Sequence, residues 1–539
     1  MPGNEDVEVK ESRIPGAGKG LFARVAFRPG DVVAAVDRPL VAELEADRML
    51  DTCAWCFHRG ATDPIERKMA ASMGLPHGFT GINSCTGCSK VGYCSRKCQS
   101  RAWKREHKYE CKILSREDVP ALPPEVRGAV KILGRLIADP DKEFVHTRTI
   151  SSFWPAGDPN GMGVINRQNE KRSTDIQVLA QAVWLYSGKP EINGLDPQSI
   201  SKGVLANIMI NATTLASVFD GVTLGMGFDP LISRANHSCD PNAELIFNQP
   251  RHEIRALRKI DVGEEILIKY IDTSNPFCVR QEALKEQYYF ACQCTKCQKG
   301  VDIEAEKFLE RPEDLGSEYR ELADRLISKY ELEVHKHIVP EADDDEALKR
   351  VAAIEAEAYA VMENGQARID DVKAAIKMCI GSKMWRWTRQ PVCQLCRRLS
   401  TLYLQSGHIY EAFRLGVKLH IEILPVLYPQ EFHPERLINA WAVSTLINVL
   451  CGPAHEEIYQ ELAKGGLPLR LIYFGFLFYL RDYTPQMFGP KTPFGKVIEN
   501  TVTQIMGGVT IPEAEIKEKL QSAGPALEAV ANNVTAENM

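Results

Sequence analysis

Cysteine and histidine residues recur in closely spaced pairs between positions 53 and 111. Two or three residues separate the members of each pair, a spacing that lets both side chains reach one metal ion. The pairs are Cys53 with Cys56, Cys85 with Cys88, Cys94 with Cys98, and His107 with Cys111. Their eight thiolate or imidazole ligands suit two closed tetrahedral zinc sites. Because so short a module cannot bury a large core, the metals are expected to supply much of its folding free energy.

The cysteine content of the whole chain also favours metal binding. The 539 residues include 16 cysteines, and the first thirty lack the basic start and apolar run of a signal peptide, so export is not expected. The cytoplasm and nucleus, the expected compartments, keep thiols reduced. A net charge of -6 argues against wholesale nucleic-acid binding. The most apolar stretch, residues 471–480, is about half as long as a membrane crossing and predicts a buried helix.

A second group of residues that could do chemistry lies between positions 235 and 297. Its segments are Asn236-His237-Ser238-Cys239-Asp240-Pro241-Asn242, Gly263-Glu264-Glu265-Ile266 with Tyr270, and Tyr288-Tyr289-Phe290-Ala291-Cys292-Gln293-Cys294-Thr295-Lys296-Cys297. Core packing alone would not bring together polar residues, tyrosines and spaced cysteines in this way. Near the start of the chain, Gly18 and Gly20 belong to a glycine-rich turn between predicted strands, where the backbone could approach a ligand closely.

These motifs resemble the SET domain of protein lysine methyltransferases, and the paired cysteines resemble a MYND zinc finger. With the finger inserted after the first strands, the chain is similar to the SMYD family of SET-and-MYND methyltransferases over roughly residues 5–300. The resemblance implies an α+β fold: a SET-domain β-fold split by the finger, a post-SET zinc cluster and a C-terminal all-α, tetratricopeptide-like domain. The implied segments are 1–50 (start of the SET domain), 51–114 (finger), 115–205 (helical SET insertion), 206–274 (core SET domain), 275–300 (post-SET zinc region) and 301–539 (C-terminal helical domain).

The resemblance also implies roles for individual residues. Tyr270 would place its hydroxyl near the transferring methyl group, and Tyr288 would line the channel of the target lysine. The implied donor, S-adenosylmethionine, would contact Ala17, Gly18, Lys19, Asn207, Asn236, His237, Tyr270 and Phe290. The spacing near Asn207 departs from the family pattern, so Asn211 could take its place.

Methyl transfer to a lysine makes physical demands that these residues could meet. The reaction is an in-line displacement, so donor and acceptor must be aligned. A lysine has a pKa of about 10.4 in water, and the reaction needs its uncharged amine. A narrow aromatic channel disfavours the ammonium and lowers that pKa. We expect Tyr270, Tyr288 and Phe290 to form such a channel.

The pairing known in MYND fingers implies two interleaved zinc sites. One ion would be held by Cys53, Cys56, Cys94 and Cys98, and the other by Cys85, Cys88, His107 and Cys111. The loop at residues 57–84 is longer than the family usually has, and it contains two further candidate ligands, His58 and His77.

A third zinc is expected behind the SET motifs. Cys292, Cys294 and Cys297 supply three ligands where a closed site needs four, and Cys239 is the expected fourth. This ion would join the segment that contains Asn236 to the segment that contains Tyr288. With no open position, it would be structural and not a Lewis acid.

The finger is also rich in basic residues, interleaved with Tyr93 and Trp103. They are Lys90, Arg96, Lys97, Arg101, Lys104, Arg105, Lys108 and Lys112. Such a face could meet nucleic acid or an acidic partner, or form a solvated exterior. Similarity to other MYND fingers ranks contact with proline-rich peptides above DNA.

The main hypothesis is therefore a protein-lysine methyltransferase that acts on a histone or another protein. The alternative is a catalytically inactive SET-and-MYND scaffold that recruits proline-rich partners in transcriptional regulation.

The elements that must position these residues can be read from hydrophobic periodicity. Strands are predicted at 243–247, 254–257 and 265–270, and helices at 126–139, 176–186 and 201–215. Beyond residue 300, helices are predicted at 319–331, 346–362, 372–379, 392–404, 410–424, 437–450, 456–463 and 469–480. Cys393 and Cys396 have ligand spacing but are expected in the core of a helix. The residues after Ala523 are expected to be disordered.

Overall fold

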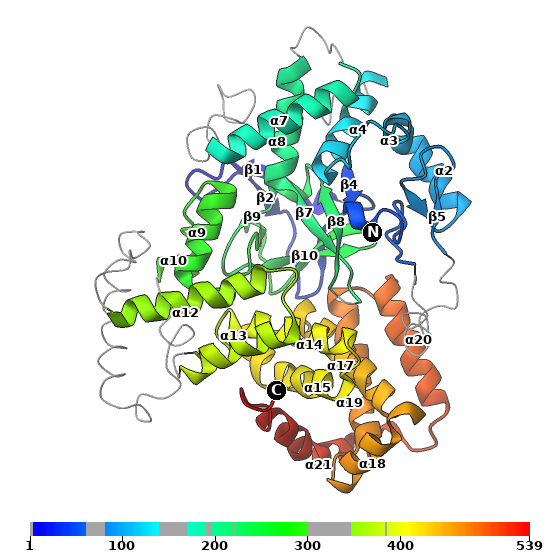
Figure 1. Cartoon of the computed structure of the whole chain (residues 1–539), viewed down its shortest axis with the longest axis vertical. Coiled ribbons are helices and arrows are strands. Elements are labelled where there is room, and N and C mark those ends of the chain that lie inside the picture. Colours follow the sequence, from blue (N-terminus) through cyan, green and yellow to red (C-terminus); the bar gives the residue numbers. More distant parts are fainter. Residues whose placement is uncertain are drawn as a thin grey trace. The chain divides into compact units, whose positions relative to one another are not determined.

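The computed structural model describes residues 4–60, 81–138, 170–189, 197–219, 221–299, 346–382 and 385–539. The chain, drawn in Figure 1, divides into two units. Unit 1 consists of residues 1–237, 241–268 and 285–290, and unit 2 of residues 238–240, 269–284 and 291–539. Unit 1 contains strands and helices, whereas the described elements of unit 2 are helices. The predicted α+β fold is therefore confirmed.

Short strands in unit 1 form several small sheets. They are β1 (Val7–Glu11), β2 (Lys19–Ala23), β3 (Val32–Val36), β4 (Val41–Leu44), β5 (Asn83–Ser84), β6 (Gly92–Tyr93), β7 (Thr213–Ala216), β8 (Thr223–Phe228), β9 (Asn236–His237), β10 (Ala243–Asn248), β11 (Arg251–Ala256) and β12 (Leu267–Ile268). The antiparallel sheets have the orders β1-β2, β10-β11-β3, β4-β8-β7 and β5-β6, while β12 pairs with β9 in parallel. The β10-β11 hairpin confirms the strands predicted at 243–247 and 254–257.

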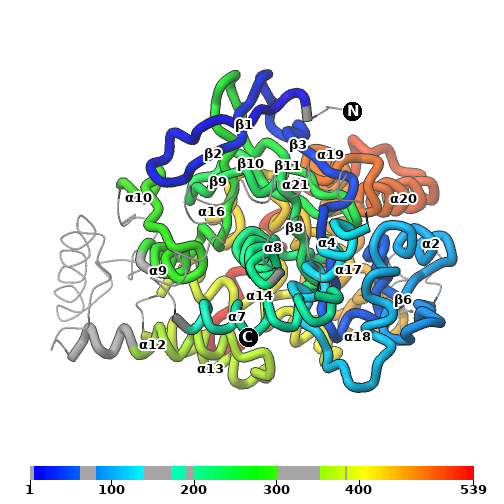
Figure 2. Tube along the Cα trace, turned by 90° about the horizontal axis from the view of Figure 1, so that it is seen from above, coloured from blue at the N-terminus to red at the C-terminus, as the bar shows by residue number. Residues whose placement is uncertain are grey.

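The helices of unit 1 include those of the finger and those packed on its sheets. They are α2 (Arg96–Arg105), α3 (Cys111–Leu114), α4 (Pro124–Ala138), α7 (Glu170–Tyr186), α8 (Pro197–Asn211) and the end of α9 (Phe277–Tyr288). Figure 2 shows α4, α7 and α8 together beside β8. Their apolar faces form one buried core that includes Leu133, Ile176 and Leu205. This core fixes the end of α8 and the strand that follows it.

One predicted helix boundary in this core is wrong. The helix expected at 201–215 ends at Asn211, and Thr213–Ala216 forms strand β7. The two β-branched threonines favour an extended backbone. Pairing with β8 also buries Leu215 completely. Tertiary pairing has therefore overridden the helical periodicity here.

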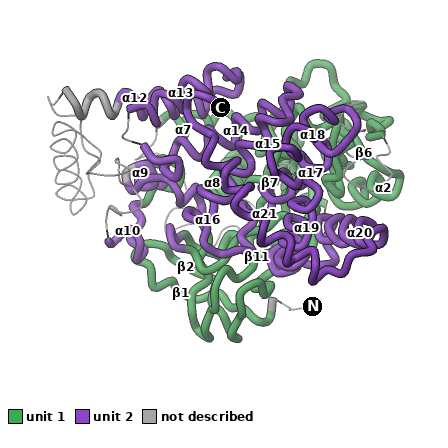
Figure 3. Tube along the Cα trace, turned by 90° about the horizontal axis from the view of Figure 1, so that it is seen from below, with its two compact units in different colours: residues 1–237, 241–268, 285–290 green, residues 238–240, 269–284, 291–539 purple. Residues whose placement is uncertain are grey.

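Unit 2, purple in Figure 3, contains the start of α9 and a series of further helices. These are α10 (Thr295–Gln298), α12 (Glu346–Glu363), α13 (Ile369–Gly381), α14 (Val392–Gln405), α15 (Ile409–Lys418), the π-helix η6 (Leu419–Ile423), α16 (Leu424–Leu427), α17 (Pro434–Leu450), α18 (Glu456–Lys464), α19 (Leu469–Met487), α20 (Pro493–Gly507) and α21 (Glu513–Asn532). Gly407 lies in the turn that connects α14 to α15, and its φ of 78° favours glycine. The predicted all-α C-terminal region is confirmed, whereas the helix expected at 319–331 lies outside the described residues.

Two predictions about unit 2 have different outcomes. Cys393 and Cys396 are buried in α14, as expected of core residues. The disorder expected after Ala523 is wrong, because α21 continues to Asn532. The end of this helix is anchored by Lys418, whose Nζ donates to the carbonyl of Ala531 at 3.3 Å. Small apolar side chains on α21 are also buried, which composition alone did not reveal.

Among the described helices, no single one is long and apolar enough to span a membrane. The helices Pro434–Leu450 and Pro453–Lys464 meet the length and hydropathy criteria only as a pair, which is bent by 79°. The apolar stretch at 471–480 lies in α19, where Phe476, Leu477 and Leu480 are buried as predicted.

Candidate functional site

The first metal site of the finger is formed by Cys53, Cys56, Cys94 and Cys98. The Sγ atoms of Cys56 and Cys94 lie 3.5 Å apart, and those of Cys94 and Cys98 lie 3.6 Å apart. Sulfurs bound to one tetrahedral zinc are separated by about 3.8 Å, so the ion fits. Ser95 caps α2 by accepting the N–H of Cys98 at 3.2 Å, which sets the last two ligands one helical turn apart.

The second metal site is formed by Cys85, Cys88, His107 and Cys111, all of which are buried. Nε2 of His107 lies 3.3 Å from Cys85 Sγ and 3.7 Å from Cys88 Sγ. The sulfurs of Cys85 and Cys111 are 3.9 Å apart, so this group also has the size of a zinc site. His58 belongs to neither group as described, and its carbonyl accepts the N–H of Cys53 at 2.9 Å. His77 lies outside the described residues.

A buried carboxylate orients the histidine of the second site. Oε1 of Glu110 lies 2.8 Å from His107 Nδ1, which leaves Nε2 directed at the cysteines. Lys131 of α4 lies 2.9 Å from the same Glu110 oxygen and 2.8 Å from Glu43 of β4. Burial alone would raise the pKa of Glu110, but Lys131 and His107 outweigh it and lower the pKa to about 2. This acid-base chain, absent from the sequence interpretation, links His107 of the second site to α4 and β4 of unit 1.

The glycine-rich turn and the Asn236 motif meet in unit 1. The Nδ2 of Asn236 donates to the carbonyl of Lys19 at 3.3 Å and to Oε1 of Glu265 at 2.8 Å. The hydroxyl of Ser12, before the turn, donates to Glu265 at 2.8 Å. A Cβ on Gly20 would lie 2.1 Å from the Glu265 carboxylate, so only glycine permits this approach. The structure thus brings Lys19 and Asn236 together, two of the residues predicted to hold the donor, and it adds Ser12 and Glu265 to their contacts.

The turn itself is open to a ligand. Gly16 and Gly18 have φ values of 78° and 68°, which favour glycine, and no neighbouring group lies near the position of an added Cβ at either one. Gly18 and Lys19 are exposed and Ala17 is half-buried. Backbone N–H groups in such left-handed turns are a usual way to bind a carboxylate.

Asn242 fastens the two halves of the central motif to each other. Its fully buried side chain donates to the carbonyl of Glu265 at 2.8 Å and accepts the N–H of Leu267 at 2.8 Å. The same two segments pair as β9 and β12, with Asn236 opposite Leu267 and His237 opposite Ile268. The spacing predicted a functional segment here, and the structure explains why Asn242 belongs to it.

Three aromatic residues, Tyr288, Tyr289 and Phe290, lie at the end of α9 and directly after it, and Phe290 lies close to the same motif. The rings of His237 and Phe290 have centroids 6.0 Å apart. Tyr288 is half-buried, and burial raises the pKa of its phenol. Tyr289 ends the helix with a φ of 64°, a strained conformation for a residue with a bulky side chain.

Arg172 of α7 supports the end of α9, and sequence reasoning did not identify it. Its guanidinium donates to the carbonyl of Met209 at 2.8 Å and to that of Gln287 at 3.4 Å. It also lies 6.0 Å from the centroid of the Tyr289 ring. A lone arginine ahead of the helix predicted at 176–186 carries no signal for such a contact, because its partners are distant in sequence.

The two asparagines considered as donor ligands lie on α8. Asn207 is buried, and its Nδ2 donates to the carbonyl of Gly203 at 3.0 Å within the helix. Asn211 donates in the same way to the carbonyl of Asn207 at 3.0 Å, and it is half-buried. Both amide nitrogens are thus engaged with their own helix, so neither residue is favoured over the other as a ligand.

Tyr270 begins a short loop in unit 2, two residues after β12. Two residues span at most about 7 Å, so the backbone of Tyr270 stays near the end of that strand. Asp272, Ser274 and Asn275 follow in the same loop and are bonded to side chains from helices of unit 2. We call residues 270–275 the tyrosine loop.

The third metal site is formed by Cys239, Cys292, Cys294 and Cys297, whose ligand atoms lie within 4.8 Å of one another. The sulfurs of Cys297 and Cys239 are 3.5 Å apart, so this group fits zinc as well as the others do. The side chain of Gln281 bonds both the N–H and the carbonyl of Cys292, at 2.9 Å and 3.0 Å. The four ligands leave no open position at a tetrahedral ion.

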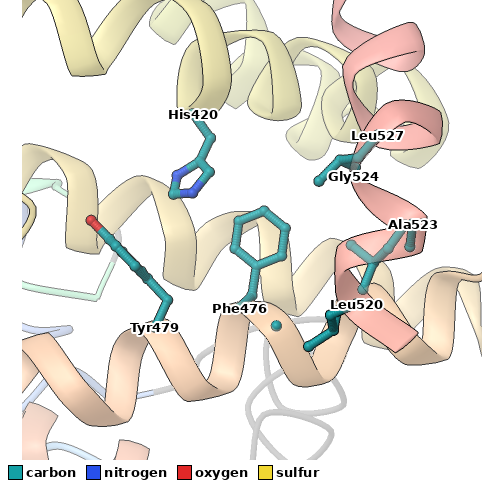
Figure 4. Close-up of a pocket in the computed structure, with 9 residues that line it drawn as sticks. His420, Phe476, Tyr479, Leu520, Ala523, Gly524 and Leu527 are labelled. Atoms are coloured by element: carbon teal, nitrogen blue, oxygen red, sulfur yellow. The ribbon is translucent and has the colours of Figure 1, made fainter. Parts of the chain in front are cut away.

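A cavity of about 160 Å³ lies elsewhere in unit 2. Figure 4 shows His420 of η6, Phe476 and Tyr479 of α19, and Leu520 and Leu527 of α21 around it. Burial, together with Arg436, lowers the pKa of His420 to about 4, so the ring is neutral at pH 7. The lining is mostly apolar and contains none of the predicted site residues.

Comparison with known proteins places the central motifs in a recognised family. A family model described as "SET domain" matches residues 18–271. Human histone-lysine N-methyltransferase SMYD3 is 29% identical over 297 residues, which are 54% of this chain and 62% of that protein. Arabidopsis thaliana histone-lysine N-methyltransferase ASHR1 is 28% identical over 305 residues, which are 56% of this chain and 57% of that protein.

A relative in fission yeast and one solved structure extend this comparison. The SET domain and MYND-type zinc finger protein 6 of Schizosaccharomyces pombe is 26% identical over 53% of this chain and 51% of its own length. A crystal structure of the SET domain of LSMT, bound to lysine and AdoHcy, aligns over 96% of this chain and 94% of its own, with 11% identity and a TM-score of 0.29. A TM-score this low does not establish a shared fold.

The curated relatives quoted above match over less than two thirds of their own length. The region that the family model matches nevertheless contains Gly18, the Asn236 motif and Tyr270, and the cysteine groups suit a MYND finger and a post-SET site. Residues 18–271 thus match the SET domain family, and the chain is similar to SMYD3, ASHR1 and the fission yeast protein over a little more than half of its length.

Proposed function

We propose that this protein is a methyltransferase that transfers methyl groups from S-adenosylmethionine to lysine residues of a protein substrate. The observation that carries the proposal is the junction of the exposed glycine turn with Asn236 and Glu265 inside the SET region. A core-packing role would not require an open turn with positive φ beside a buried carboxylate. The names of the relatives, two of which are histone-lysine N-methyltransferases, support the same activity.

The donor would be held by groups that match its charges. Backbone N–H groups of Gly18 and Lys19 suit its carboxylate, while Ala17, whose own N–H donates to the carbonyl of Ile14 at 3.1 Å, would complete the turn that presents them. Both hydrogens of the Asn236 amide are engaged, so its side-chain oxygen is the atom left to accept from the donor's ammonium group. Phe290 would pack against the adenine, and the backbone of His237 would complete the pocket, with Asn207 or Asn211 as a further contact. The donor supplies an electrophilic methyl group on a sulfonium, and these residues would orient it.

The lysine would enter along the aromatic side chains. Tyr288, whose raised pKa keeps its phenol neutral, would line the channel and disfavour the ammonium form of the substrate. The Tyr270 hydroxyl would accept weakly from the polarised methyl group and align it with the amine. The amine's lone pair forms the new C–N bond as the C–S bond breaks, and the proton of the product leaves to solvent.

The three metal sites would have structural roles. Zinc in the first and second sites would stabilise the finger, because so short a module has little other core. Zinc in the third site would fix Cys239, two residues after His237, to Cys292, two residues after Phe290. With four protein ligands at each ion, none would activate water or substrate.

The finger would contribute protein recognition. Trp103 on α2 is 47% exposed and lies among basic side chains, a combination that suits an apolar or proline-rich peptide with acidic flanks. We rank this above DNA binding, because the net charge of the chain is -6. Histone or other protein substrates would be met in the nucleus or cytoplasm.

The test combines donor binding with methyl transfer. Calorimetric titration should show that S-adenosylmethionine binds the wild type and Tyr270→Phe alike, because the phenyl ring keeps the packing. Transfer of a labelled methyl group to core histones or to a heat-denatured protein extract should fall about a hundredfold in Tyr270→Phe. Tyr410→Phe, on α15 of unit 2, is the matched control and should retain full activity.

Two outcomes would contradict the proposal. If the wild type does not bind S-adenosylmethionine, the assignment of the donor pocket is wrong. Binding without transfer to any lysine would favour the inactive scaffold. Full activity of Tyr270→Phe would show instead that the methyl-transfer role belongs to another residue.

A further inference from the structure

The tyrosine loop is held on its C-terminal side by helices that belong to the C-terminal part of the chain. Nε2 of Gln394, in the first turn of α14, donates to Oδ2 of Asp272 at 2.6 Å. Gln390, directly before α14, donates to the hydroxyl oxygen of Ser274 at 2.7 Å. Tyr359 of α12 donates to Oδ1 of Asn275 at 3.1 Å. All of these residues belong to unit 2, shown in Figure 3.

The two carboxylate oxygens of Asp272 bond different partners, one within the loop and one on α14. Oδ1 accepts the N–H and the hydroxyl of Ser274, at 2.9 Å and 2.5 Å, and so closes a local turn. Oδ2 is bonded to Gln394. Gln390 is almost fully buried, and its side-chain oxygen accepts the N–H of Gln394 at 3.1 Å, so the two glutamines also brace each other. A loop that needed only a local turn would not engage two side chains from sequence positions more than 100 residues away.

Two lysines also contact the tyrosine loop or its flank within unit 2. On the N-terminal side, Nζ of Lys269 lies 6.0 Å from the ring centroid of Tyr428, which is stacked on His433 with centroids 4.3 Å apart. Beyond Asp272, Nζ of Lys296 donates to the carbonyl of Thr273 at 3.0 Å. Lys296 lies between two cysteines of the third metal site, so that site and the helices hold the same loop.

We propose that Gln390 and Gln394 are positioning residues that fix the backbone of Tyr270 through Asp272 and Ser274. This inference rests on the role proposed for Tyr270 in methyl transfer. It assigns the helices of the C-terminal region a direct part in the alignment of the reacting groups. Asp272 and Ser274 transmit this restraint over the two to four residues that separate them from Tyr270.

The sharpest variant is Gln394→Glu, which replaces the donor by a second carboxylate next to Asp272. The matched control is Gln405→Glu, the same change at the exposed last residue of α14. The double variant Asp272→Asn/Gln394→Glu exchanges donor and acceptor, and should restore the bond. Melting temperatures of the two single variants are compared to show that both chains are folded.

Hydrogen exchange tests the positioning without any need for activity. In Gln394→Glu, the amides of residues 270–276 should exchange at least about tenfold faster than in the wild type. Those of the glycine turn at 16–23 should not change. Gln405→Glu should match the wild type, and the double variant should recover most of the protection. Unchanged exchange at 270–276 in Gln394→Glu would overturn the proposal.

Kinetic measurements then distinguish a displaced Tyr270 from a general loss of structure in Gln394→Glu. With core histones and labelled S-adenosylmethionine, kcat of Gln394→Glu should fall between about tenfold and a hundredfold, because small displacements of a reacting group are costly. The dissociation constant of S-adenosylmethionine from calorimetry should stay the same. An equal loss of donor affinity would contradict a positioning role. A wild type without transfer would refute the proposed activity alone, since the exchange experiment still decides whether the glutamines hold the loop.

Discussion

In the finger, the two metal sites are supported in different ways. At the first site, a neighbouring side chain bonds the backbone between Cys53 and Cys56, whereas at the second site a neighbouring side chain bonds the ligand His107 itself. Arg38 supports the first site: its guanidinium donates to the carbonyl of Trp55 at 2.6 Å and to that of Ala54 at 3.2 Å. It also lies over the Trp55 ring, 4.6 Å from the centroid. The second site instead has His107 bonded to Glu110, which is paired with Lys131.

The two supports differ in what they can change. Arg38 shapes the loop that presents two thiols but touches no ligand atom in the contacts described, so it affects how often the site is formed. Glu110 fixes the tautomer and orientation of a ligand and raises its basicity, so it affects the strength of the bond to the ion. Similar zinc ligands can therefore be supported by preorganisation of the backbone or by tuning of the ligand. Variants that remove one support at a time test this distinction.

The largest effect is expected for Lys131→Met. This change removes the cation that the buried Glu43 and Glu110 share, so that Glu110 keeps only the His107 ring at 2.8 Å and Glu43 keeps only the more distant Arg127 at 3.4 Å among the contacts described. Uncompensated buried charge costs about 3–5 kcal/mol. We expect a loss of that order in unfolding free energy and faster release of zinc from the second site.

Zinc release from this variant can be assigned to a site by alkylation of the exposed cysteines and mass spectrometry. Chelator should expose Cys85, Cys88 and Cys111 before Cys94 and Cys98. Arg48→Met is the control, since its pair with Asp51 at 2.9 Å is partly exposed and worth at most about 1 kcal/mol. Loss of zinc from both sites together would show that the supports are not separate.

For Arg38→Lys we expect a smaller loss of stability than for Lys131→Met, and release of zinc from the first site before the second. Lysine keeps a positive charge near Glu106, which Arg38 contacts at 2.6 Å, but it cannot also reach two carbonyls and stack on Trp55. The lost hydrogen bonds should destabilise the finger by about 1–3 kcal/mol. Here the chelator should expose Cys94 and Cys98 first. If the second site is emptied first, the assignment of Arg38 to the first site is wrong.

The ligand groups could be predicted from sequence, but their supports could not. Cysteine pairs carry their function in their spacing, so the ligands Cys53 to Cys111 were identifiable without a structure. Arg38 and Glu106 are 68 residues apart, and Lys131 and Glu43 are 88 apart. Nothing local distinguishes a buried lysine from a solvated one, because its burial depends on which strand its helix packs against.

The proposed catalytic region follows the same rule. Asn236 and His237 lie in a recognisable motif, whereas Glu265, although part of a motif itself, had no role assigned until the structure placed its carboxylate next to Gly20. Gln394 and Asp272 are 122 residues apart, and a glutamine at a helix start has no distinctive pattern. The wrong end of α8 and the unexpected helix α21 have the same origin, since in each case packing with a distant element decided the local structure.

The smallest effect is expected for Glu110→Gln, and it separates ligand tuning from charge balance. A glutamine oxygen can still accept from His107 Nδ1, so the tautomer is kept, while the negative charge that strengthens the ligand is lost. Lys131 retains Glu43 as its partner at 2.8 Å, so stability should change less than in Lys131→Met. Loss of a second-layer carboxylate lowers metal affinity by about tenfold or more. Competition with a chelator should therefore show weaker zinc binding at the second site and an unchanged first site. Equal zinc affinity in Glu110→Gln and the wild type would mean that Glu110 orients His107 without strengthening its bond to the ion. Both sites would then be supported only by fixing the geometry of their ligands.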